Sequence, residues 1–184
     1  MNKVIGLDLD GVIIDHSELK VKLAKKHGVD ITLKETPSEI MWTFFPEETW
    51  REIQTGLYGG SELSMKAPLM PGALTGIEVI KAGGNPYFLV TRRRNMDIIV
   101  EVLRTGNLWP KFFNEKNVFA AQNLEDKEII SKKLGITAYA DDERRVLKSL
   151  LSVPDKILFD PFGVFDDSEF VNVGSWVELT KRLI

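Results

Sequence analysis

Short apolar runs alternate with segments of helical periodicity along most of the chain. Six runs have the length that is typical of buried strands. They lie at residues 3–9, 86–91, 117–120, 136–140, 156–159 and 170–173. Apolar residues three and four positions apart predict helices between these runs. The predicted helices lie between Gly72 and Gly83, at residues 95–105, 126–134 and 143–151, and from Ser175 onward. Strands that alternate with helices favour right-handed βαβ units, so we predict an α/β fold with a doubly wound parallel sheet.

Residues 15–70 do not follow this alternation. Helical spacing continues over residues 16–27, and Pro46 followed by two glutamates predicts a second helix start. Gly59 and Gly60 end that helix. We therefore predict a core of residues 1–14 and 71–184, with residues 15–70 inserted after the first strand as a small helical lid.

Composition narrows the possible partners. The chain has 184 residues, enough for one core with a small insert, and a net charge of −3, which argues against a nucleic acid polymer as partner. It has no cysteine, which excludes disulfides and thiolate metal sites. Charged residues interrupt every long apolar run, and the amino terminus has no signal-peptide pattern, so we expect a cytoplasmic protein without a membrane partner.

Three of the predicted strands end in a residue that can react or bind a ligand. Asp8 ends the apolar residues 4–7 of the first run, Thr91 closes the run at 86–91, and Asp141 follows the run at 136–140. In open α/β sheets, ligands bind beyond the carboxyl ends of the strands, near the point where the strand order reverses. We therefore expect these three side chains to lie together at one end of the sheet.

The acidic residues at these strand ends predict a cation site. Asp8 and Asp10 point the same way if the strand stays extended, and carboxylates so close favour a divalent cation or a shared proton. Asp141 and Asp142 add negative charge from a second strand. Hard oxygen ligands suit Mg²⁺, which takes one or two carboxylates and a substrate phosphate. The alternative is a solvated acidic loop, or an adventitious cation site without chemistry.

The same segments resemble the motifs of the haloacid dehalogenase-like (HAD) hydrolase superfamily, in the order that the family keeps. Residues 8–12, Asp-Leu-Asp-Gly-Val, match the first motif, Thr91 the second, Lys127 the third, and Asp141 with Asp142 the fourth. Other lysines near the third motif are Lys116, Lys132 and Lys133. The position of Lys127 at a predicted helix start, just before the strand of Asp141, favours it. The resemblance covers nearly the whole chain and implies a HAD-like core, with residues 15–70 as a helical cap.

The resemblance implies a catalytic role for each matched side chain. Asp8 is the nucleophile that attacks phosphorus and forms an aspartyl-phosphate. Asp10 protonates the leaving alkoxide and then takes a proton from the attacking water, and we expect crowding by other carboxylates to raise its pKa. Thr91 hydrogen-bonds a phosphoryl oxygen, and Lys127 offsets negative charge. Since displacement of halide from carbon needs no acid, Asp10 favours a phosphatase over a dehalogenase.

The cofactor that the resemblance implies is Mg²⁺. Its ligands would be Asp8, the backbone carbonyl of Asp10, and Asp142. Asp141 stands where the family often has glycine, so we expect it to support the site from outside the coordination shell. Gly11 of the first motif has a supporting role.

The expected substrate is a small phosphate ester, in particular a nucleoside or deoxynucleoside monophosphate. Two segments resemble those of the 5'(3')-deoxyribonucleotidase branch of the superfamily. They are residues 67–74, which return from the cap to the core, and Ser175 with Trp176, which open the last helix. The alternatives are a sugar-phosphate phosphatase, a phosphotransferase, and a non-catalytic module that binds a phospholigand. Retention of both Asp8 and Asp10 argues against the last of these, because a binding module needs no nucleophile.

Two further groups are candidates for substrate binding. Trp42, Phe44 and Phe45 can stack on a nucleobase, or they can fill the core of the inserted segment. Thr91 is followed by Arg92, Arg93 and Arg94, of which Arg93 is the one expected to face a phosphate or carboxylate. His16 and His27 flank a predicted helix without an evident partner and receive no role.

Overall fold

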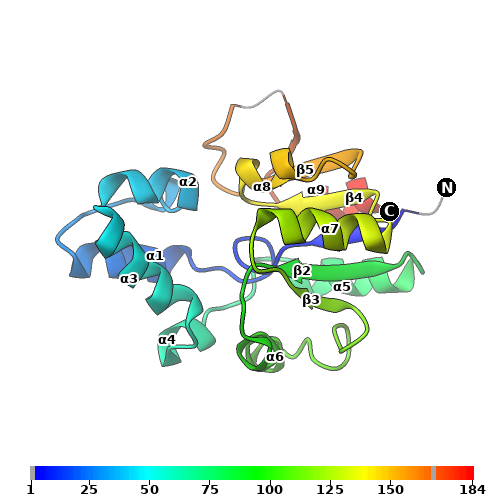
Figure 1. Ribbon diagram of the computed structural model, residues 1–184, viewed down its shortest axis with the longest axis horizontal. Coiled ribbons are helices and arrows are strands. Elements are labelled where there is room, and N and C mark those ends of the chain that lie inside the picture. The colour runs from blue at the N-terminus through cyan, green and yellow to red at the C-terminus, as the bar shows by residue number, and fades with distance from the viewer. Residues whose placement is uncertain (1–2, 167–168) are drawn as a thin grey trace.

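One parallel sheet forms the centre of the structure, a computed structural model that describes residues 3–166 and 169–184. Within these residues, six strands pair in the order β3-β2-β1-β4-β5-β6 (Figure 1). The strands are β1 (Ile5–Leu7), β2 (Tyr87–Thr91), β3 (Val118–Ala120), β4 (Ala138–Asp141), β5 (Asp155–Phe159) and β6 (Val171–Val173). Every pair of neighbours is parallel. The predicted α/β fold with a doubly wound parallel sheet is therefore confirmed.

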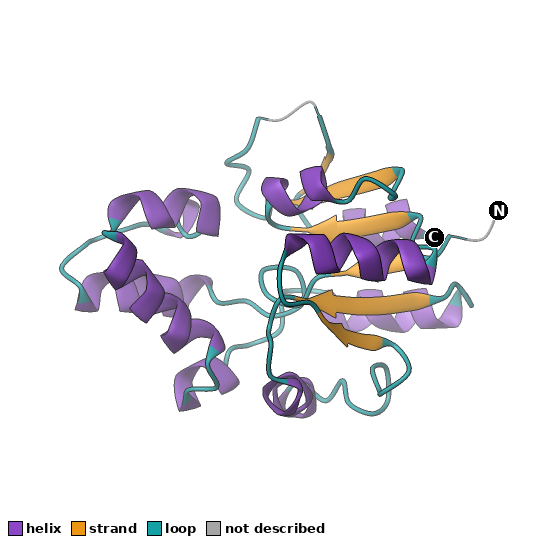
Figure 2. Ribbon diagram, in the orientation of Figure 1, coloured by secondary structure: helices purple, strands orange, loops and turns teal. Residues whose placement is uncertain are grey.

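Helices cover both faces of this sheet (Figure 2). One face carries α5 (Ala73–Ala82), α6 (Met96–Thr105) and α9 (Trp176–Leu183), and the other carries α7 (Leu124–Leu134) and α8 (Arg144–Ser149). Strand residues alternate between the two cores: Leu89 and Ile157 belong to the first, Val90 and Leu158 to the second. Because both faces are covered, the strands have continuous apolar runs rather than alternating ones.

The helices that precede α5 in the connection between β1 and β2 form a separate layer, which lies to the left of the sheet in Figure 1. They are α1 (Ser17–Lys26), α2 (Ser38–Met41), α3 (Glu47–Tyr58) and α4 (Glu62–Met65), with 3₁₀ turns at Leu33–Glu35 and Trp42–Phe44. This layer, here called the cap, has its own buried apolar cluster, formed by Ala24, Ile31, Met41, Phe45, Ile53 and Leu57. Two adjacent connections join it to the sheet, where a bridge pairs Ile14 with Leu69.

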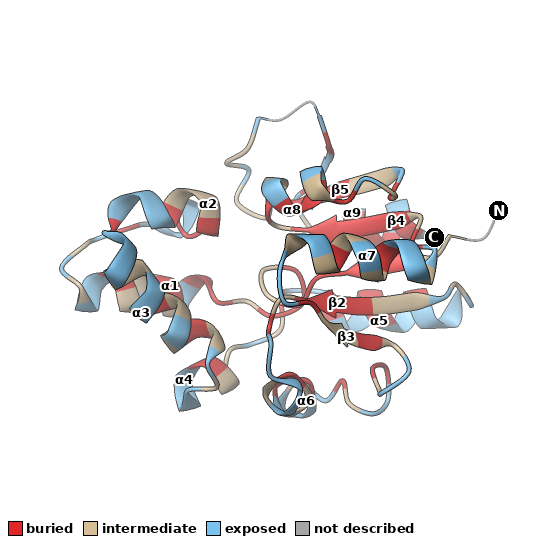
Figure 3. Ribbon diagram, in the orientation of Figure 1, coloured by how far each residue is buried: buried red, intermediate tan, exposed pale blue. Residues whose placement is uncertain are grey.

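The helices are short. α3 has 12 residues, while α2 and α4 have four each and lie where the sequence predicts no helix, since a single turn shows no apolar periodicity. Among the described residues, no helix has the length and apolar character needed to cross a membrane. Figure 3 shows buried positions concentrated on the strands and exposed positions on the outer faces of the helices.

Several element boundaries differ from those that the sequence predicts, and two of these differences have a clear local cause. β1 ends at Leu7, because the chain then turns into a loop in which Gly11 has a φ of 85°. α7 begins at Leu124, earlier than predicted, because the Asn123 side chain accepts a hydrogen bond from the amide of Asp126 at 2.8 Å and caps the helix. Both differences arise from local hydrogen bonding and turn geometry, which apolar periodicity does not reveal.

Trp176, the first residue of α9, connects the end of the chain to the loop after β1. Its side chain is buried, and its indole Nε1 donates to the carbonyl of Val12 at 2.7 Å. The ring also lies against Gly76 of α5, where an added Cβ would be 2.3 Å from Cε3 of Trp176. Glycine is therefore required where α5 meets α9, and Trp176 supports the loop that carries Asp8 and Asp10.

The substitution Gly76→Ala should destabilise the protein. The new methyl group must displace Trp176, at a cost on the order of 1–3 kcal/mol. The higher helix propensity of alanine offsets about 1 kcal/mol of this. We expect a net decrease of about 1–2 kcal/mol in the free energy of unfolding, measured by urea denaturation. Thr75→Ala, at an exposed position of the same helix, should change it by less than about 0.5 kcal/mol; equal effects of the two substitutions would contradict the packing role of Gly76.

Candidate active site

The predicted site residues come together at the carboxyl end of the sheet. Asp8 follows β1, Thr91 is the last residue of β2, and Asp141 is the last residue of β4. β1 lies between β2 and β4, so the strand order reverses beside it. This is the place where open α/β sheets bind ligands.

Lys127 lies in the first turns of α7 and is fully buried. Its ammonium donates to Oδ1 of Asp8 at 2.6 Å and to Oδ2 of Asp141 at 2.7 Å. Burial would lower the pKa of Lys127, but these two carboxylates raise it well above its ordinary value, so Lys127 keeps its charge. The alternative lysines do not reach the site, because all three have exposed side chains: Lys116, Lys132 and Lys133.

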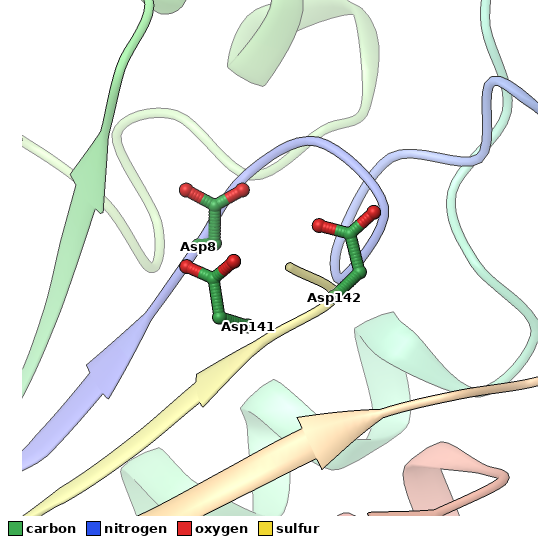
Figure 4. Close-up of side chains that lie close together, drawn as sticks. All are labelled: Asp8, Asp141 and Asp142. Carbon is green, nitrogen blue, oxygen red and sulfur yellow. The ribbon is translucent and has the colours of Figure 1, made fainter. Parts of the chain in front are cut away.

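Three carboxylates lie close enough to hold one cation. Asp8, Asp141 and Asp142 each offer one carboxylate oxygen, and these three oxygens lie within 4.8 Å of one another (Figure 4). Asp141 is already engaged on both sides, because Oδ2 accepts from Lys127 and Oδ1 accepts from the amide of Glu143 at 3.0 Å. The Asp142 carboxylate, in contrast, makes no hydrogen bond or ion pair with the described residues. Asp8 and Asp142 are therefore the carboxylates with free oxygens for a metal ion.

The charges and the backbone of the loop also fit a divalent cation. Three ionised carboxylates and the Lys127 ammonium leave two negative charges, which one divalent cation would balance. Burial raises the pKa of Asp142 well above its ordinary value, Glu143 adds to the increase, and Lys20 opposes it. Gly11 passes directly beside Asp142, since a Cβ there would lie 2.2 Å from Oδ2. Only glycine leaves room for that carboxylate.

Asp8 combines a reactive position with a perturbed pKa. Burial raises the pKa of Asp8 to about 7; Asp141 and Asp10 add to the increase, and Lys127 opposes it. Oδ1 is held by Lys127, while Oδ2 accepts no hydrogen bond from the described residues. Asp8 also lines a pocket of about 720 Å³. One carboxylate oxygen is thus fixed and the other is available at the edge of a cavity.

Asp10 is held in a strong ion pair, and here the sequence expectation is wrong. Arg93 donates to both carboxylate oxygens, from Nε at 2.8 Å and from Nη2 at 2.7 Å, and His16 Nε2 lies 2.8 Å from Oδ1. Burial would raise the pKa of Asp10, but Arg93 and His16 hold it well below its usual range. Crowding by carboxylates does not decide this pKa, because a guanidinium contacts Asp10 directly.

His16 and Tyr58 belong to the site although sequence reasoning missed them. Tyr58, at the end of α3, meets His16 edge to face at 5.8 Å and lies 5.6 Å below the Arg93 guanidinium. Burial raises the pKa of the Tyr58 hydroxyl above its ordinary value, and Asp10 adds to this. No motif marks these two residues, because their contacts form only when α3 folds back over the loop after β1.

The cap also contacts α8, the helix that follows Asp142. The carboxylate of Glu39 in α2 accepts from Nε of Arg144 at 3.0 Å and from the amide of Arg145 at 3.1 Å. These groups come just after Asp142 in the chain. The position of the cap is therefore coupled to the segment that carries a candidate metal ligand.

The three arginines after Thr91 have different surroundings. Arg92 pairs with Glu143 at 2.7 Å, and Arg93 pairs with Asp10. Arg94 is exposed and makes no ion pair with the described residues. All three line the large pocket. Arg93, which was expected to meet the substrate, is therefore occupied by Asp10 in this conformation, while Arg94 is not engaged.

The three aromatic residues of the cap that the sequence suggests for base stacking do not line that pocket. Trp42 and Phe44 are 54% and 40% exposed and lie elsewhere on the cap, while Phe45 is buried in the cap's own core. Phe45 therefore serves the packing of the cap and has no exposed face for a base, which corrects that part of the prediction. Tyr58 is the aromatic residue that lines the pocket.

Without a divalent cation, the free energy of unfolding should fall as the pH rises from about 5 to about 8. The pKa of Asp8 is about 7 in the folded protein, above its ordinary value of 3.8. Folding thus favours protonated Asp8, and that contribution is lost as the pH passes through the folded pKa. The low pKa of Asp10 acts oppositely, but its contribution is complete above about pH 5. Urea denaturation in a chelator should show a decrease on the order of 1–3 kcal/mol.

The variant Asp142→Asn provides the matched control for this pH dependence. The substitution removes a carboxylate that is costly to ionise because it is buried. In the presence of the chelator, the variant should therefore be more stable than the unmodified protein at about pH 8. Stability that stays constant or increases over this pH range in the unmodified protein would show that Asp8 is ionised throughout.

Comparison with solved structures places the fold in a known group. No protein-family model matches the sequence, and no curated protein matches it significantly. A predicted phosphatase from Clostridium acetobutylicum aligns over 100% of this chain and 98% of its own, with a TM-score of 0.68 and 16% identity. A HAD family hydrolase from Deinococcus radiodurans R1, with bound phosphate and sodium, aligns over 97% and 93%, with a TM-score of 0.63 and 13% identity.

A third similar structure carries a metal ion. The HAD hydrolase YfnB from Bacillus subtilis, bound to magnesium, aligns over 99% of this chain and 98% of its own, with a TM-score of 0.62 and 15% identity. At such identities the likeness concerns the fold, and it extends over both the sheet and the cap. The chain has the fold of the HAD-superfamily hydrolases.

Proposed function

We propose that this protein is a Mg²⁺-dependent phosphomonoester hydrolase that acts through an aspartyl-phosphate on Asp8. The observation that carries the proposal is the arrangement around Asp8. A buried ammonium holds one carboxylate oxygen, the other is unengaged at a pocket, and two further carboxylates lie within 4.8 Å. The fold neighbours, among them a predicted phosphatase and a hydrolase with bound phosphate, support the same chemistry.

Asp8 acts as the nucleophile in this proposal. Its free oxygen attacks phosphorus, the bond from phosphorus to the ester oxygen breaks, and the alkoxide leaves with that electron pair. Water then attacks the aspartyl-phosphate, which releases phosphate and restores the carboxylate. Lys127 keeps Asp8 oriented and offsets negative charge on the transferring group, and Thr91, which lines the same pocket, is placed to donate to a phosphoryl oxygen.

The residues that would hold Mg²⁺ are Asp8, Asp142 and the backbone carbonyl of Asp10, with Asp141 in support. When bound, the ion would offset the charges of the phosphoryl group and of Asp8, which otherwise repel each other. Asp141 remains with Lys127 and with the amide of Glu143, and so keeps the ligands in position.

Asp10 supplies the acid and base in this proposal, but it must first leave Arg93. A carboxylate that accepts two hydrogen bonds from a guanidinium holds no proton to give. An anionic substrate that draws Arg93 away, or a shift of the cap that moves His16, would release it. Retention of Asp10 beside Asp8 favours hydrolysis of a phosphate ester over a non-catalytic role, and a pocket of about 720 Å³ leaves room for water as the acceptor.

The substrate class that fits the pocket is a small phosphate ester. The likeness to the deoxyribonucleotidase branch favours a nucleoside or deoxynucleoside monophosphate. Most residues that line the pocket, however, have polar or charged side chains, among them Arg51, Gln54 and Thr55. These groups suit a sugar phosphate as the second candidate, because they can bind hydroxyl groups. A phosphate-release screen over both classes, with and without Mg²⁺, separates the two.

Substitution of the nucleophile tests the reaction itself. Asp8→Asn preserves the shape of the side chain but removes its negative charge, so phosphate release should fall by about three orders of magnitude or more. The unmodified protein should lose comparable activity in a chelator and regain it with Mg²⁺. Circular dichroism of the variant checks that it folds. Activity of Asp8→Asn near that of the unmodified protein would reject Asp8 as the nucleophile.

The acid role of Asp10 can be tested with leaving groups of different basicity. Asp10→Asn should slow hydrolysis of an alkyl phosphate, whose alkoxide needs a proton, more strongly than hydrolysis of an activated aryl phosphate. We expect the two losses in kcat/KM to differ by about tenfold or more. Equal losses for both substrates would mean that Asp10 does not protonate the leaving group.

A further inference from the structure

We propose that the pocket above Asp8 binds a second anionic group of the substrate, through Arg51 of the cap and Arg94 of the core. The inference rests on the proposed phosphatase function and narrows its substrate class. The preferred substrates would be phosphomonoesters that carry a second acidic group, either a carboxylate or another phosphate.

The cap contributes one polar face of α3 to this pocket. The four residues of α3 that line the pocket are Arg51, Gln54, Thr55 and Tyr58. Their spacing of three, four and seven positions places them on one side of the helix. The opposite side carries Ile53 and Leu57, which are buried in the cap core. A helix with its apolar side in the cap core therefore presents a cationic, hydrogen-bonding side to the pocket.

The core contributes the facing wall, from the segment after β2. Arg92, Arg93, Arg94 and Asn95 all line the pocket, and Ile98 of α6 lies beside them. The Asn95 side chain caps α6 by accepting from the amide of Asp97 at 2.9 Å. The pocket is thus enclosed by arginines from two separate parts of the fold, while Asp8 and Thr91 lie at its reactive end.

The ion pairs decide which of these arginines are available. Arg92 is neutralised by Glu143, and Arg93 by Asp10. Among the residues that the structure describes, Arg51 pairs only with Glu47, one turn earlier on the same helix, in a contact where both side chains are more than 70% exposed. Such a surface pair is weak and is easily replaced. Arg94 has no ion pair among the described residues. The guanidinium groups of Arg51 and Arg94 are therefore available to bind an anion.

This surplus of positive charge is separate from what the reacting phosphoryl group needs. That group would meet Lys127, Thr91 and the metal ligands at the strand ends. Arg51 and Arg94 belong to the walls formed by α3 and by the segment after β2, away from Lys127, which is buried behind Asp8. Guanidinium groups are suited to bind carboxylate and phosphate oxygens by paired hydrogen bonds. The wall chemistry therefore favours an anion over a flat, uncharged base.

The experiment compares short straight-chain monophosphates that are matched in length and end in a hydroxyl, a carboxylate or a second phosphate. We expect kcat/KM for the two acidic series to exceed that of the hydroxyl series by about tenfold or more at low salt. The ratio should decrease as salt screens the exposed arginines. The carboxylate and phosphate series together identify which second anion is preferred.

Variants test whether the two arginines cause this preference. Arg94→Gln and Arg51→Gln should each lower the ratio of acidic to hydroxyl substrates several-fold, and the double variant should bring it near one. Arg104→Gln is the matched control, because Arg104 is an exposed arginine of α6 that pairs with Glu101 and does not line the pocket. It should leave the ratio unchanged.

Two results would overturn the inference. One is a ratio near one in the unmodified protein, with hydroxyl-ended monophosphates still hydrolysed, which leaves the phosphatase proposal intact. The other is a ratio that Arg94→Gln and Arg51→Gln do not change. If no compound is hydrolysed, the phosphatase proposal fails, and equilibrium binding of the same three series, measured by calorimetry, then decides the anion preference by the same ratio and variants.

Discussion

The buried ammonium of Lys127 is the interaction on which the site depends. It lies between Asp8 and Asp141, which come from the neighbouring strands β1 and β4. Without it, two buried carboxylates would face each other with no positive charge nearby, which is among the costliest arrangements in a protein interior. Its position depends in turn on the start of α7, which Asn123 caps. A local cap and the pairing of two strands thus determine where the candidate nucleophile points.

A second constraint comes from the charge that Lys127 leaves uncompensated. When Asp8, Asp141 and Asp142 are all ionised, the Lys127 ammonium balances one of their three negative charges and two remain. Burial makes these two uncompensated charges costly. Protons can supply the missing charge at low pH, and a divalent cation can supply it at higher pH. The same electrostatic imbalance therefore accounts for the raised pKa of Asp8 and for the fit to a metal ion.

The cap turns this strand-end site into an enclosed one. Glu39 of the cap accepts hydrogen bonds from the start of α8 in the core, and Tyr58 of the cap contacts both His16 and Arg93. Arg93 in turn holds Asp10. Because the acid and base candidate is connected to cap residues in this way, a movement of the cap would change the surroundings of Asp10 while Asp8 and Lys127 stay fixed in the core.

The sheet, and the positions along it of the candidate site residues, could be predicted from the sequence alone. Continuous apolar runs identify strands that are covered on both faces, and the polar residue that ends each run must then lie at the same edge of a parallel sheet. Asp8, Thr91 and Asp141 could be placed in this way, and the motif order selected Lys127. Such inferences succeed because each depends on local periodicity and on one general rule of topology.

Which charged groups contact one another depends on the tertiary structure. The pKa of Asp10 was predicted with the wrong direction, because Arg93 lies 83 positions away in the chain and its contact with Asp10 is made in space. The position of Arg51 is a similar case: α3 has a polar side, but its sequence does not show whether that side faces water or, as in the structure, lines a pocket. Periodicity tells which residues share a face of a helix, whereas the packing of the cap on the core determines what that face contacts.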